Sequence, residues 1–458
     1  MGQTPKTMCL LVMSLAALLT HSAGLTAQSI EITEEVKSSI RARVDNGYNV
    51  GIIVGLIDGR GSRYFSYGET VFGNATTPDE HTVFEIGSIT KVFTSILLAD
   101  MVRSGELALD DPIDLYLLEG VTAPQGGGRS ITLYDLATHT SGLPRMPSNF
   151  APADAANPYA DYTVEQMYAF LSEYELQREI GSQHEYSNLA AGLLGNLLVN
   201  AAGMTYGDLI EQKITSVIDM DDTAIELTPD QQERLARGHV GTTVVPNWDI
   251  PALAGAGALR STASDMLTFL AANTGVEETR LYGAMSETHQ PRETAGSASM
   301  QVALGWHVRS DGDRKVVWHN GGTGGYRSFA GFLQGGTTGV VVLTNSNVSA
   351  DDIGFHLLGS SFQLEQIRAV VAVDRAILER YVGQYELSPA LIFDIGFESG
   401  QLTAQLTGQP RFSVYAESDT KFFYKVVDAQ ITFEVDERGE VTALVLHQNG
   451  MDQRAKKR

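Results

Sequence analysis

The chain has 458 residues, of which 43% are hydrophobic and 46 are glycine. This composition predicts a folded protein with a sizeable core and excludes a disordered chain. Lys and Arg number 32 against 55 Asp and Glu, a formal net charge of −23, which disfavours nucleic acid and anionic membranes as partners because both would repel it.

The first 27 residues predict a signal peptide. Lys6 gives a basic start, residues 8–19 form an apolar run too short to span a bilayer, and small residues cluster at 22–27, as a signal peptidase requires. We therefore expect an exported protein, periplasmic or secreted, without a membrane span after removal of residues 1–27; the alternative is an uncleaved anchor. The only cysteine, Cys9, lies in this segment, so the mature chain would have no disulfide, catalytic thiolate or zinc–thiolate site.

The next elements predict an α+β domain over residues 28–370. The apolar run 50–57, a DGRG turn and RYFSYGE predict a hairpin, and helical patterns dominate from 84 to 275. Strand signals then return, and a helical pattern covers 351–370. Strands at both ends of a helical middle predict one sheet that uses both ends of this region. The returning strands are expected at VALGWHVR, KVVWHNGG, RSFAGFLQ and GVVVLTNSN.

The C-terminal residues 376–458 predict a small antiparallel β-barrel or meander. A short helical piece, DRAILERYVG, leads into brief alternating runs separated by Gly, Asp and Ser turns. The terminal AKKR is expected to be a frayed, solvated tail.

Two Ser-x-x-Lys sequences occur in the chain. Ser88 follows a glycine at the start of an apolar helix, where free N–H groups favour developing negative charge, and Lys91 one turn later can reach its hydroxyl. Alone, this pair also fits an ordinary helix cap with a solvated lysine. The copy at Ser418–Lys421 lies in a polar stretch between two strands and is predicted to be a turn.

Two further segments carry candidate chemistry. Tyr186 and Asn188, in YSN, lie where a loop enters an apolar helix; the tyrosine can relay a proton if cations depress its pKa, and the asparagine caps the helix or binds substrate. In VVWHNGGTGGYRSFAGF, a strand beginning near His319 opens into four glycines within 321–325. Such glycines indicate a close approach to the backbone, as by a substrate added as a strand, although a glycine-rich bulge with a packed histidine is the alternative.

In this order the segments resemble the penicillin-recognising serine hydrolases, which include class C β-lactamases, D,D-peptidases, D-amino-acid peptidases and β-lactamase-like esterases. FEIGSITKVFT resembles their nucleophile motif, YSN their Tyr-x-Asn and HNGGTGGYRSFAGF their Lys/His-x-Gly strand. ITLYDLATHTSGLP and GALRSTASDMLTFL resemble their non-catalytic signatures, which makes His139 structural. The resemblance covers residues 30 to 365, and the tail from 376 resembles a small barrel appended to some members.

The resemblance implies a β-lactamase/transpeptidase-like fold, with an antiparallel sheet flanked by helices and a helical subdomain, and hydrolysis through a covalent acyl-enzyme without a metal or cofactor. Ser88 is then the nucleophile, Lys91 or Tyr186 accepts its proton, and Tyr186 protonates the leaving group. The N–H groups of Ser88 and Gly322 form the oxyanion hole. The substrate, a small molecule or short peptide, is oriented by Asn188, His319, Asn320 and Gly321.

One position departs from the most common pattern. His319 stands where most β-lactamases and D,D-peptidases carry lysine, and members with histidine tend to be peptidases acting on D-residues or esterases. A histidine is only partly charged near neutral pH, so it should hold a carboxylate less firmly and disfavour efficient β-lactam turnover. The rivals are a penicillin-binding sensor that acylates with little turnover, a true β-lactamase or D,D-carboxypeptidase, and a barrel that is itself the binding module. The loop 143–163, with Tyr159 and Tyr162, is expected to line the cleft or to form a plain surface excursion. The oligomeric state stays open.

Overall fold

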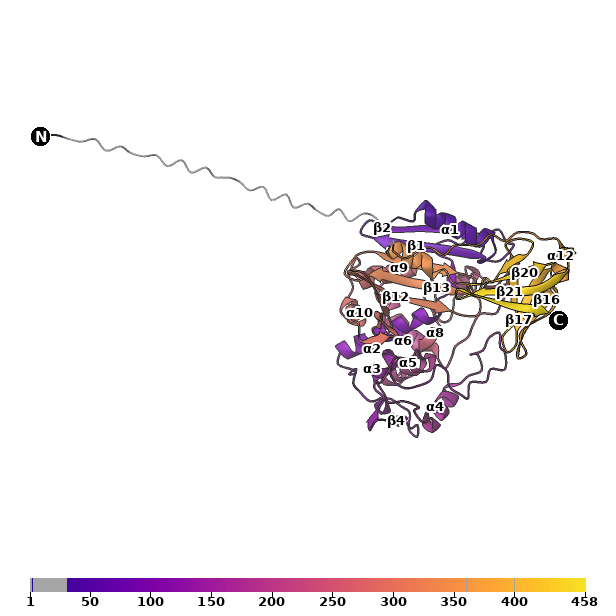
Figure 1. Ribbon diagram of the computed structural model, residues 1–458. Helices are drawn as coiled ribbons and strands as arrows, with labels where there is room; N and C mark the ends of the chain where they lie inside the picture. Colours follow the sequence, from indigo (N-terminus) through magenta and orange to yellow (C-terminus); the bar gives the residue numbers. More distant parts are fainter. Residues whose placement is uncertain (1, 3–30, 360, 399) are drawn as a thin grey trace.

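The protein is described from a computed structural model that covers residues 2, 31–359, 361–398 and 400–458. It forms two lobes, an α+β lobe and a C-terminal barrel, drawn in yellow in Figure 1. The segment predicted to be a signal peptide lies outside the described residues except for Gly2. In the described part of the chain no single helix is long and apolar enough to cross a bilayer; only Asn188–Ala202 with Tyr206–Val217, bent by 76°, meets that criterion as a pair.

The first lobe is built on one eight-stranded sheet with the order β2-β1-β14-β13-β12-β11-β10-β9, in which every neighbouring pair is antiparallel. The predicted hairpin is confirmed, and β1 also pairs with β14, so the sheet uses both ends of the lobe's sequence as expected. The strands are β1 (Gly51–Asp58), β2 (Gly61–Gly68), β9 (Glu293–Ala295), β10 (Ser297–Val302), β11 (His307–Asp311), β12 (Arg314–Gly322), β13 (Arg327–Leu333) and β14 (Gly339–Thr344).

Helices cover both faces of this sheet, and this explains why β1 is buried along its whole length. Alternate residues of β1 enter two separate apolar clusters: Ile53 and Ile57 face the helical middle with α9 (Ala263–Thr274), whereas Val54 and Leu56 face α1 (Glu34–Asp45) and α11 (Asp351–Leu358). Since side chains alternate across a strand, the two faces of the sheet belong to two different cores.

The helical middle packs on one face of the sheet and supplies most of the larger core. Its helices are α2 (Thr90–Arg103), α3 (Leu133–Ala137), α4 (Val164–Glu173), α5 (Asn188–Ala202), α6 (Tyr206–Lys213), α7 (Pro229–Glu233), α8 (Ala254–Gly257) and α10 (Tyr282–Thr288). Short 3-10 turns occur at η1 (Gly87–Ile89), η2 (Ile113–Leu115) and η3 (Thr215–Val217). Three two-stranded ribbons join these elements: β3 (Val83–Glu85) with β8 (Arg260–Thr262), β4 (Gln125–Gly126) with β5 (Arg129–Ser130), and β6 (His239–Val240) with β7 (Thr243–Val244).

The second lobe is a closed antiparallel barrel, as predicted, preceded by α12 (Arg375–Tyr381). The expectation of a frayed AKKR tail is wrong, because residues 455–457 belong to the last strand, which pairs with β15 and closes the barrel, and the Arg458 N–H donates to the carbonyl of Gln384 at 2.9 Å. Ala455 in that strand is fully buried. The strands are β15 (Gly383–Ser388), β16 (Leu391–Glu398), β17 (Gln401–Leu406), β18 (Phe412–Ala416), β19 (Lys421–Phe423), β20 (Ala429–Val435), β21 (Val441–Gln448) and β22 (Met451–Lys457).

The barrel meets the first lobe at the C-terminal end of α1. Lys425, in the β19–β20 loop, donates hydrogen bonds to the carbonyls of Asn46 at 2.6 Å and Gly47 at 3.0 Å. Its ammonium lies 3.6 Å from the ring centroid of Tyr415 and 4.9 Å from that of Tyr48. A cation at this position satisfies carbonyls that the end of a helix leaves free, and burial lowers the pKa of Lys425 to about 8.

Two other sequence expectations are wrong in detail. VALGWHVR was expected to be one strand, but β10 ends at Val302 and β11 begins at His307, with a turn between them in which Gly305 has φ 70°. The helical pattern over 351–370 was also too long, because α11 ends at Leu358, directly before Gly359. A glycine lies in the turn in the first case and directly follows the helix in the second.

Candidate active site

Ser88 lies in the η1 turn directly before α2, at the helix start that the sequence predicts. The end of β12 packs against this turn: a Cβ added at Gly321 would collide with the carbonyl oxygen of Ile86, and one added at Gly87 would lie 2.7 Å from the backbone nitrogen of Gly322. The Ser328 hydroxyl also donates to the Ile86 carbonyl at 2.8 Å. The close approach that the glycines indicate is therefore made, at Gly321, by the protein's own turn.

Lys91 is held beneath Ser88 with only 2% of its surface exposed. Its Nζ lies 2.9 Å from the Ser88 Oγ and 2.6 Å from the carbonyl oxygen of Ala256, which α8 supplies. Burial holds the pKa of Lys91 well below its usual range, and the nearby Arg145 guanidinium lowers it further. An amine in this position carries a lone pair and can accept the Ser88 proton.

Tyr186 lies beside the same pair, with the Lys91 amine and the Arg145 guanidinium near its ring. The Lys91 Nζ is 4.9 Å from its ring centroid, and the Arg145 guanidinium carbon is 5.1 Å from it. Burial nevertheless raises the pKa of Tyr186 to about 12, against the smaller opposing effects of the Ser88 hydroxyl and Arg145. A cation, Arg145, is present, as the sequence interpretation required, but desolvation outweighs it and keeps the phenol protonated.

Asn188 is the first residue of α5, but the helix is capped by its neighbour. The Ser187 hydroxyl accepts the hydrogen bond of the Ala190 N–H at 2.9 Å. Asn188 is left with a long contact to the Tyr159 hydroxyl, 3.5 Å, and its buried Oδ1 has no hydrogen-bond partner among the described residues. An amide with an unsatisfied acceptor beside Ser88 is free to bind a donor of a substrate.

His319 is buried near Tyr186 and is uncharged. Its ring centroid is 6.3 Å from that of Tyr186 and 4.9 Å from that of His307, and 2% of its surface is exposed. Burial, reinforced by His307 and Lys91, holds the pKa of His319 well below its usual range. The site therefore presents a neutral imidazole on the strand that leads to Gly322.

His139 packs against Tyr186 but is not the catalytic base. Its ring centroid is 4.7 Å from that of Tyr186, and its Nδ1 accepts the Ser187 N–H at 3.2 Å. Burial lowers the pKa of His139 strongly, so it acts as a fixed acceptor at the start of α5. Among the described residues no group of His, Cys, Asp or Glu is arranged to hold a metal ion.

The structure separates Asn320 from the other predicted site residues. Alternation in β12 turns its side chain toward the opposite face of the sheet, where its Nδ2 donates to Asp351 at 2.6 Å. Gly322 lies at the end of the strand, and its register partner is Arg327. A small pocket joins this strand end to the nucleophile, with Ser88, Gly322, Asn188, Tyr159 and Trp248 in its lining.

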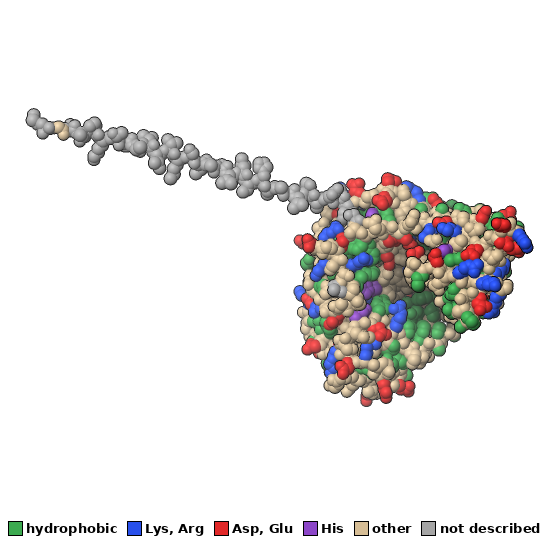
Figure 2. Space-filling view, viewed as in Figure 1, with side chains coloured by type: hydrophobic (Ala, Val, Ile, Leu, Met, Phe, Trp, Pro, Cys, Tyr) green, Lys and Arg blue, Asp and Glu red, His purple; other side chains and the backbone are tan. Residues whose placement is uncertain are grey.

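The loop 143–163 lines the cleft through Tyr159 but not through Tyr162. The Tyr159 ring lies 5.3 Å from that of Trp248 and lines the pocket, whereas Tyr162 is buried and donates to Asn149 at 2.9 Å. Figure 2 shows the molecule hollowed near β12, β13 and α8, with histidine side chains at the edge of the hollow. Sequence reasoning missed Trp248, which no motif marks, and Arg145, which directly follows the recognisable HTSGLP segment.

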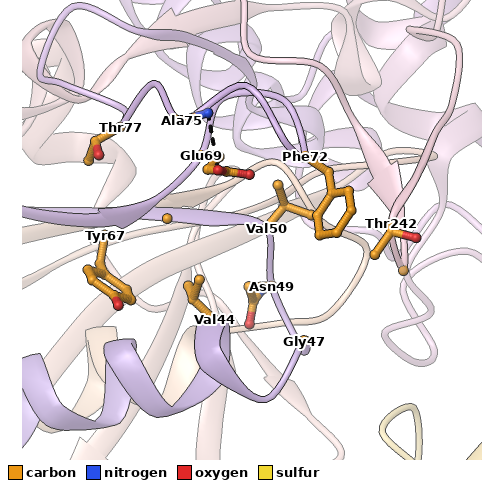
Figure 3. Close-up of a pocket in the computed structure, with 12 residues that line it drawn as sticks. Val44, Gly47, Asn49, Val50, Tyr67, Glu69, Phe72, Ala75, Thr77 and Thr242 are labelled. Atoms are coloured by element: carbon orange, nitrogen blue, oxygen red, sulfur yellow. Dashed lines mark hydrogen bonds between the residues drawn. The ribbon is translucent and has the colours of Figure 1, made fainter.

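A separate pocket of about 330 Å³ lies at the end of α1, between β2 and the β6–β7 ribbon (Figure 3). Val44, Val50 and Phe72 give it an apolar lining. Its one acidic residue, Glu69, already accepts hydrogen bonds from the backbone N–H groups of Gly73 and Ala75. This pocket contains none of the predicted catalytic residues.

Comparisons with known proteins agree with this geometry. The β-lactamase family model matches residues 36–357, and a domain of unknown function, DUF3471, matches residues 368–457. The D-alanyl-D-alanine-carboxypeptidase/endopeptidase AmpH of Escherichia coli K12 is 32% identical over 65% of this chain and 80% of its own. The chain therefore belongs to the β-lactamase family and is a serine hydrolase of the β-lactamase-related type, with an appended barrel.

Solved structures show the same fold. A β-lactamase/D-alanine carboxypeptidase from Yersinia pestis superposes with a TM-score of 0.61 at 27% identity, over 68% of this chain and 92% of that one. A class C β-lactamase from Rhodobacter sphaeroides gives a TM-score of 0.62 at 23% identity, over 72% and 99% of the two chains. The predicted β-lactamase/transpeptidase-like fold is confirmed.

Proposed function

We propose that the protein hydrolyses an amide or ester bond in short peptides that contain D-amino acids, through a covalent acyl-enzyme on Ser88. The observation that carries this proposal is the buried Lys91 amine, 2.9 Å from the Ser88 Oγ, with its pKa depressed by burial. The similarity to a D-alanyl-D-alanine-carboxypeptidase/endopeptidase supports the substrate class.

In the acylation step the uncharged Lys91 takes the Ser88 proton while Oγ forms a bond to the substrate carbonyl carbon. The carbonyl electron pair moves onto oxygen, which the N–H groups of Ser88 and Gly322 stabilise. Because burial holds Tyr186 protonated, Tyr186 serves as the acid: its proton goes to the leaving nitrogen or oxygen as the carbonyl–leaving-group bond breaks, and Lys91 returns a proton to the phenol. Water then releases the acyl group by the reverse sequence of proton transfers.

Side chains around Ser88 and Lys91 orient the substrate. The unsatisfied Oδ1 of Asn188 is suited to accept a peptide N–H. The neutral His319 accepts or donates one hydrogen bond but supplies no charge, which disfavours tight binding of a β-lactam carboxylate and hence efficient β-lactam turnover. Neither Asn320, bonded to Asp351, nor Gly321, packed on Ile86, has a free side-chain group for this purpose.

The remaining assignments complete the proposal. Residues 1–27 are an export signal, so the enzyme acts in the periplasm or outside the cell. Residues 28–370 form the catalytic domain, and residues 376–458 form a barrel that supports it. The substrates are small molecules or short peptides, and the acidic charge disfavours nucleic acid as a partner.

Intact-protein mass spectrometry tests this scheme. The protein is mixed with a short-chain p-nitrophenyl ester, a D-alanyl-D-alanine peptide or a penicillin, and product release is followed in parallel. A transient adduct that maps to Ser88, lost in Ser88→Ala and kept in Ser418→Ala, is the expected result. A stable penicillin adduct without turnover of ester or peptide would instead identify a sensor, and full turnover by Ser88→Ala would refute the role of Ser88.

A further inference from the structure

Arg145 is an exposed cation whose backbone is fixed at the catalytic site. Its carbonyl oxygen accepts the N–H groups of Asn188 at 3.0 Å and Leu189 at 3.3 Å. These are first-turn donors of α5, which have no partner inside the helix. The position of Arg145 is therefore set by the same helix start that presents Tyr186 and Asn188, although the loop after it runs over the surface.

The Arg145 guanidinium lies over the Tyr186 ring but has no carboxylate partner. No hydrogen bond or ion pair joins this guanidinium to any side chain in residues 31–359, 361–398 or 400–458, and its contact within the site is the ring, 5.1 Å from the guanidinium carbon. The charges that shift the pKa values of Lys91 and Tyr186 include Arg145, and no carboxylate of the described chain is among them. In a chain of net charge −23, an unneutralised guanidinium at the reacting groups points to an anion brought by the substrate.

The other basic groups near Ser88 are unsuited to bind that anion. Lys91 is buried, and its Nζ is taken up by Ser88 and the Ala256 carbonyl. His319 is neutral. Arg327, beyond the end of β12, donates to the carbonyls of Thr323 and Tyr326 and has the Asp351 carboxylate as its nearest opposing charge. Four basic groups lie near Ser88: Arg145, Lys91, His319 and Arg327. Only Arg145 is a permanent charge that faces the site without a partner among the described residues.

We propose that Arg145 is the anion-binding residue of this enzyme, and that it binds a carboxylate on the leaving-group side of the substrate. This assignment rests on the proposed function, in which Tyr186 gives its proton to the leaving group. A guanidinium over the Tyr186 ring is then adjacent to the departing amine or alcohol. The preferred substrate is a peptide whose scissile bond precedes a C-terminal residue with a free carboxylate, and Arg145 does here what neutral His319 cannot.

The test compares two substrates that differ only in charge: an acyl-D-alanyl-D-alanine peptide and its C-terminal carboxamide. In wild type the free acid should have the lower KM. Arg145→Ala should raise KM about tenfold for the acid and leave KM for the amide unchanged, since a hydrogen bond to a charged group is lost only with the acid. A change in kcat through the altered pKa of Lys91 should be the same for both substrates. Arg145→Lys should recover part of the preference. Arg314→Ala, at the far end of β12 and 52% exposed, controls for the loss of one surface charge.

The outcomes separate a binding role from a structural one. A loss of kcat/KM in Arg145→Ala that is equal for the acid and the amide would overturn the proposal and make Arg145 a positioning residue for Tyr186. Equal KM values for acid and amide in wild type would also overturn it. Either result would leave the acyl-enzyme on Ser88 intact, because ester turnover and the Ser88 adduct report that function separately. A preference for the acid that falls with added salt in wild type, and not in Arg145→Ala, would support an ionic contact.

Discussion

The chain contains the same Ser-x-x-Lys motif in both lobes, and only the first copy has the surroundings for chemistry. Lys91 is 2% exposed, and its Nζ contacts the Ser88 Oγ at 2.9 Å. In the barrel, Ser418 lies exposed in the turn between β18 and β19, and Lys421 is the exposed first residue of β19. There the Ser418 hydroxyl accepts the backbone N–H of Lys421 at 3.1 Å, so the motif closes a hairpin.

What separates the two copies is the packing around each serine. Ser88 lies in the 3-10 turn η1, which continues into α2. The glycines of β12 pack against this turn. Ser418 is held only by its own hairpin, where side-chain to backbone hydrogen bonds are the usual use of serine. A motif of four residues therefore carries little meaning until long-range contacts bury its lysine.

The largest expected effect on kcat comes from replacing the lysine of each motif in turn. Lys91→Met should lower kcat for ester or peptide by about 10⁴-fold, because the proton acceptor of Ser88 is removed. The protein should still fold, with a loss of stability of about 1–3 kcal/mol, because the buried Ala256 carbonyl loses its donor. Lys421→Met should leave kcat unchanged. Steady-state kinetics and thermal melts of both variants measure the contrast, and equal activities would show that burial of Lys91 serves no catalytic purpose.

The first lobe should also respond to acid through its buried histidines. His289 is 6% exposed, lies 2.9 Å from the Asn273 Oδ1 and packs on Phe332, and burial lowers its pKa to about 3. The folded pKa lies below the ordinary value of 6.5, so the unfolded chain binds a proton first as the pH falls. The stabilising contribution is complete above pH 6.5 and is lost toward pH 3, by up to about 5 kcal/mol.

Urea unfolding of wild type and His289→Gln across this window measures that contribution. The difference in the free energy of unfolding between the two proteins should shrink as the pH falls below 6.5. A difference that stays constant with pH would mean that His289 is protonated equally in the folded and unfolded chains.

The sequence was sufficient to predict elements whose signal is local. The β1–β2 hairpin, the helix after Ser88 and the short helix at Arg375–Tyr381 each carry their own pattern of apolar and turn residues, and all three are present. The motifs also predicted that Ser88, Lys91 and Tyr186 would meet, and the structure brings them together. Their catalytic roles stay predictions.

Features that depend on distant contacts could not be predicted in this way. The strand β22 reads MDQRAKK, and Ala455 is its one buried residue, so its polar pattern suggested a tail; pairing with β15 makes it a strand. The Ala256 carbonyl that fixes Lys91 has no side-chain signal at all. Arg145 was overlooked because its significance comes from its place over the Tyr186 ring.

A smaller effect is expected from the contact that distinguishes the first serine turn. Gly321→Ala would place a methyl group against the Ile86 carbonyl and the Ser328 hydroxyl, which must shift the turn that carries Ser88. We expect a loss of about 2 kcal/mol of stability, as for overpacking, together with a lower kcat. Gly59→Ala is the matched control, because a Cβ there meets nothing within 4 Å. Chemical denaturation and ester turnover should therefore change for the first variant and not for the second.

The smallest effect concerns the lysine that joins the two lobes. At neutral pH the hydrogen bonds of Lys425 to Asn46 and Gly47 and its contact with Tyr415 are opposed by the cost of burying the ammonium, so Lys425→Met should change stability by about 1 kcal/mol or less. The pH dependence is more telling. Since burial lowers the pKa from 10.5 to about 8, the unfolded chain binds more protons between these values, and stability should rise with pH through that window. Urea unfolding should show this rise in the free energy of unfolding in wild type and in Lys421→Met, and a weaker rise in Lys425→Met. If the free energy rises equally in all three proteins, the ammonium of Lys425 is not buried at the junction, and the barrel does not dock through it.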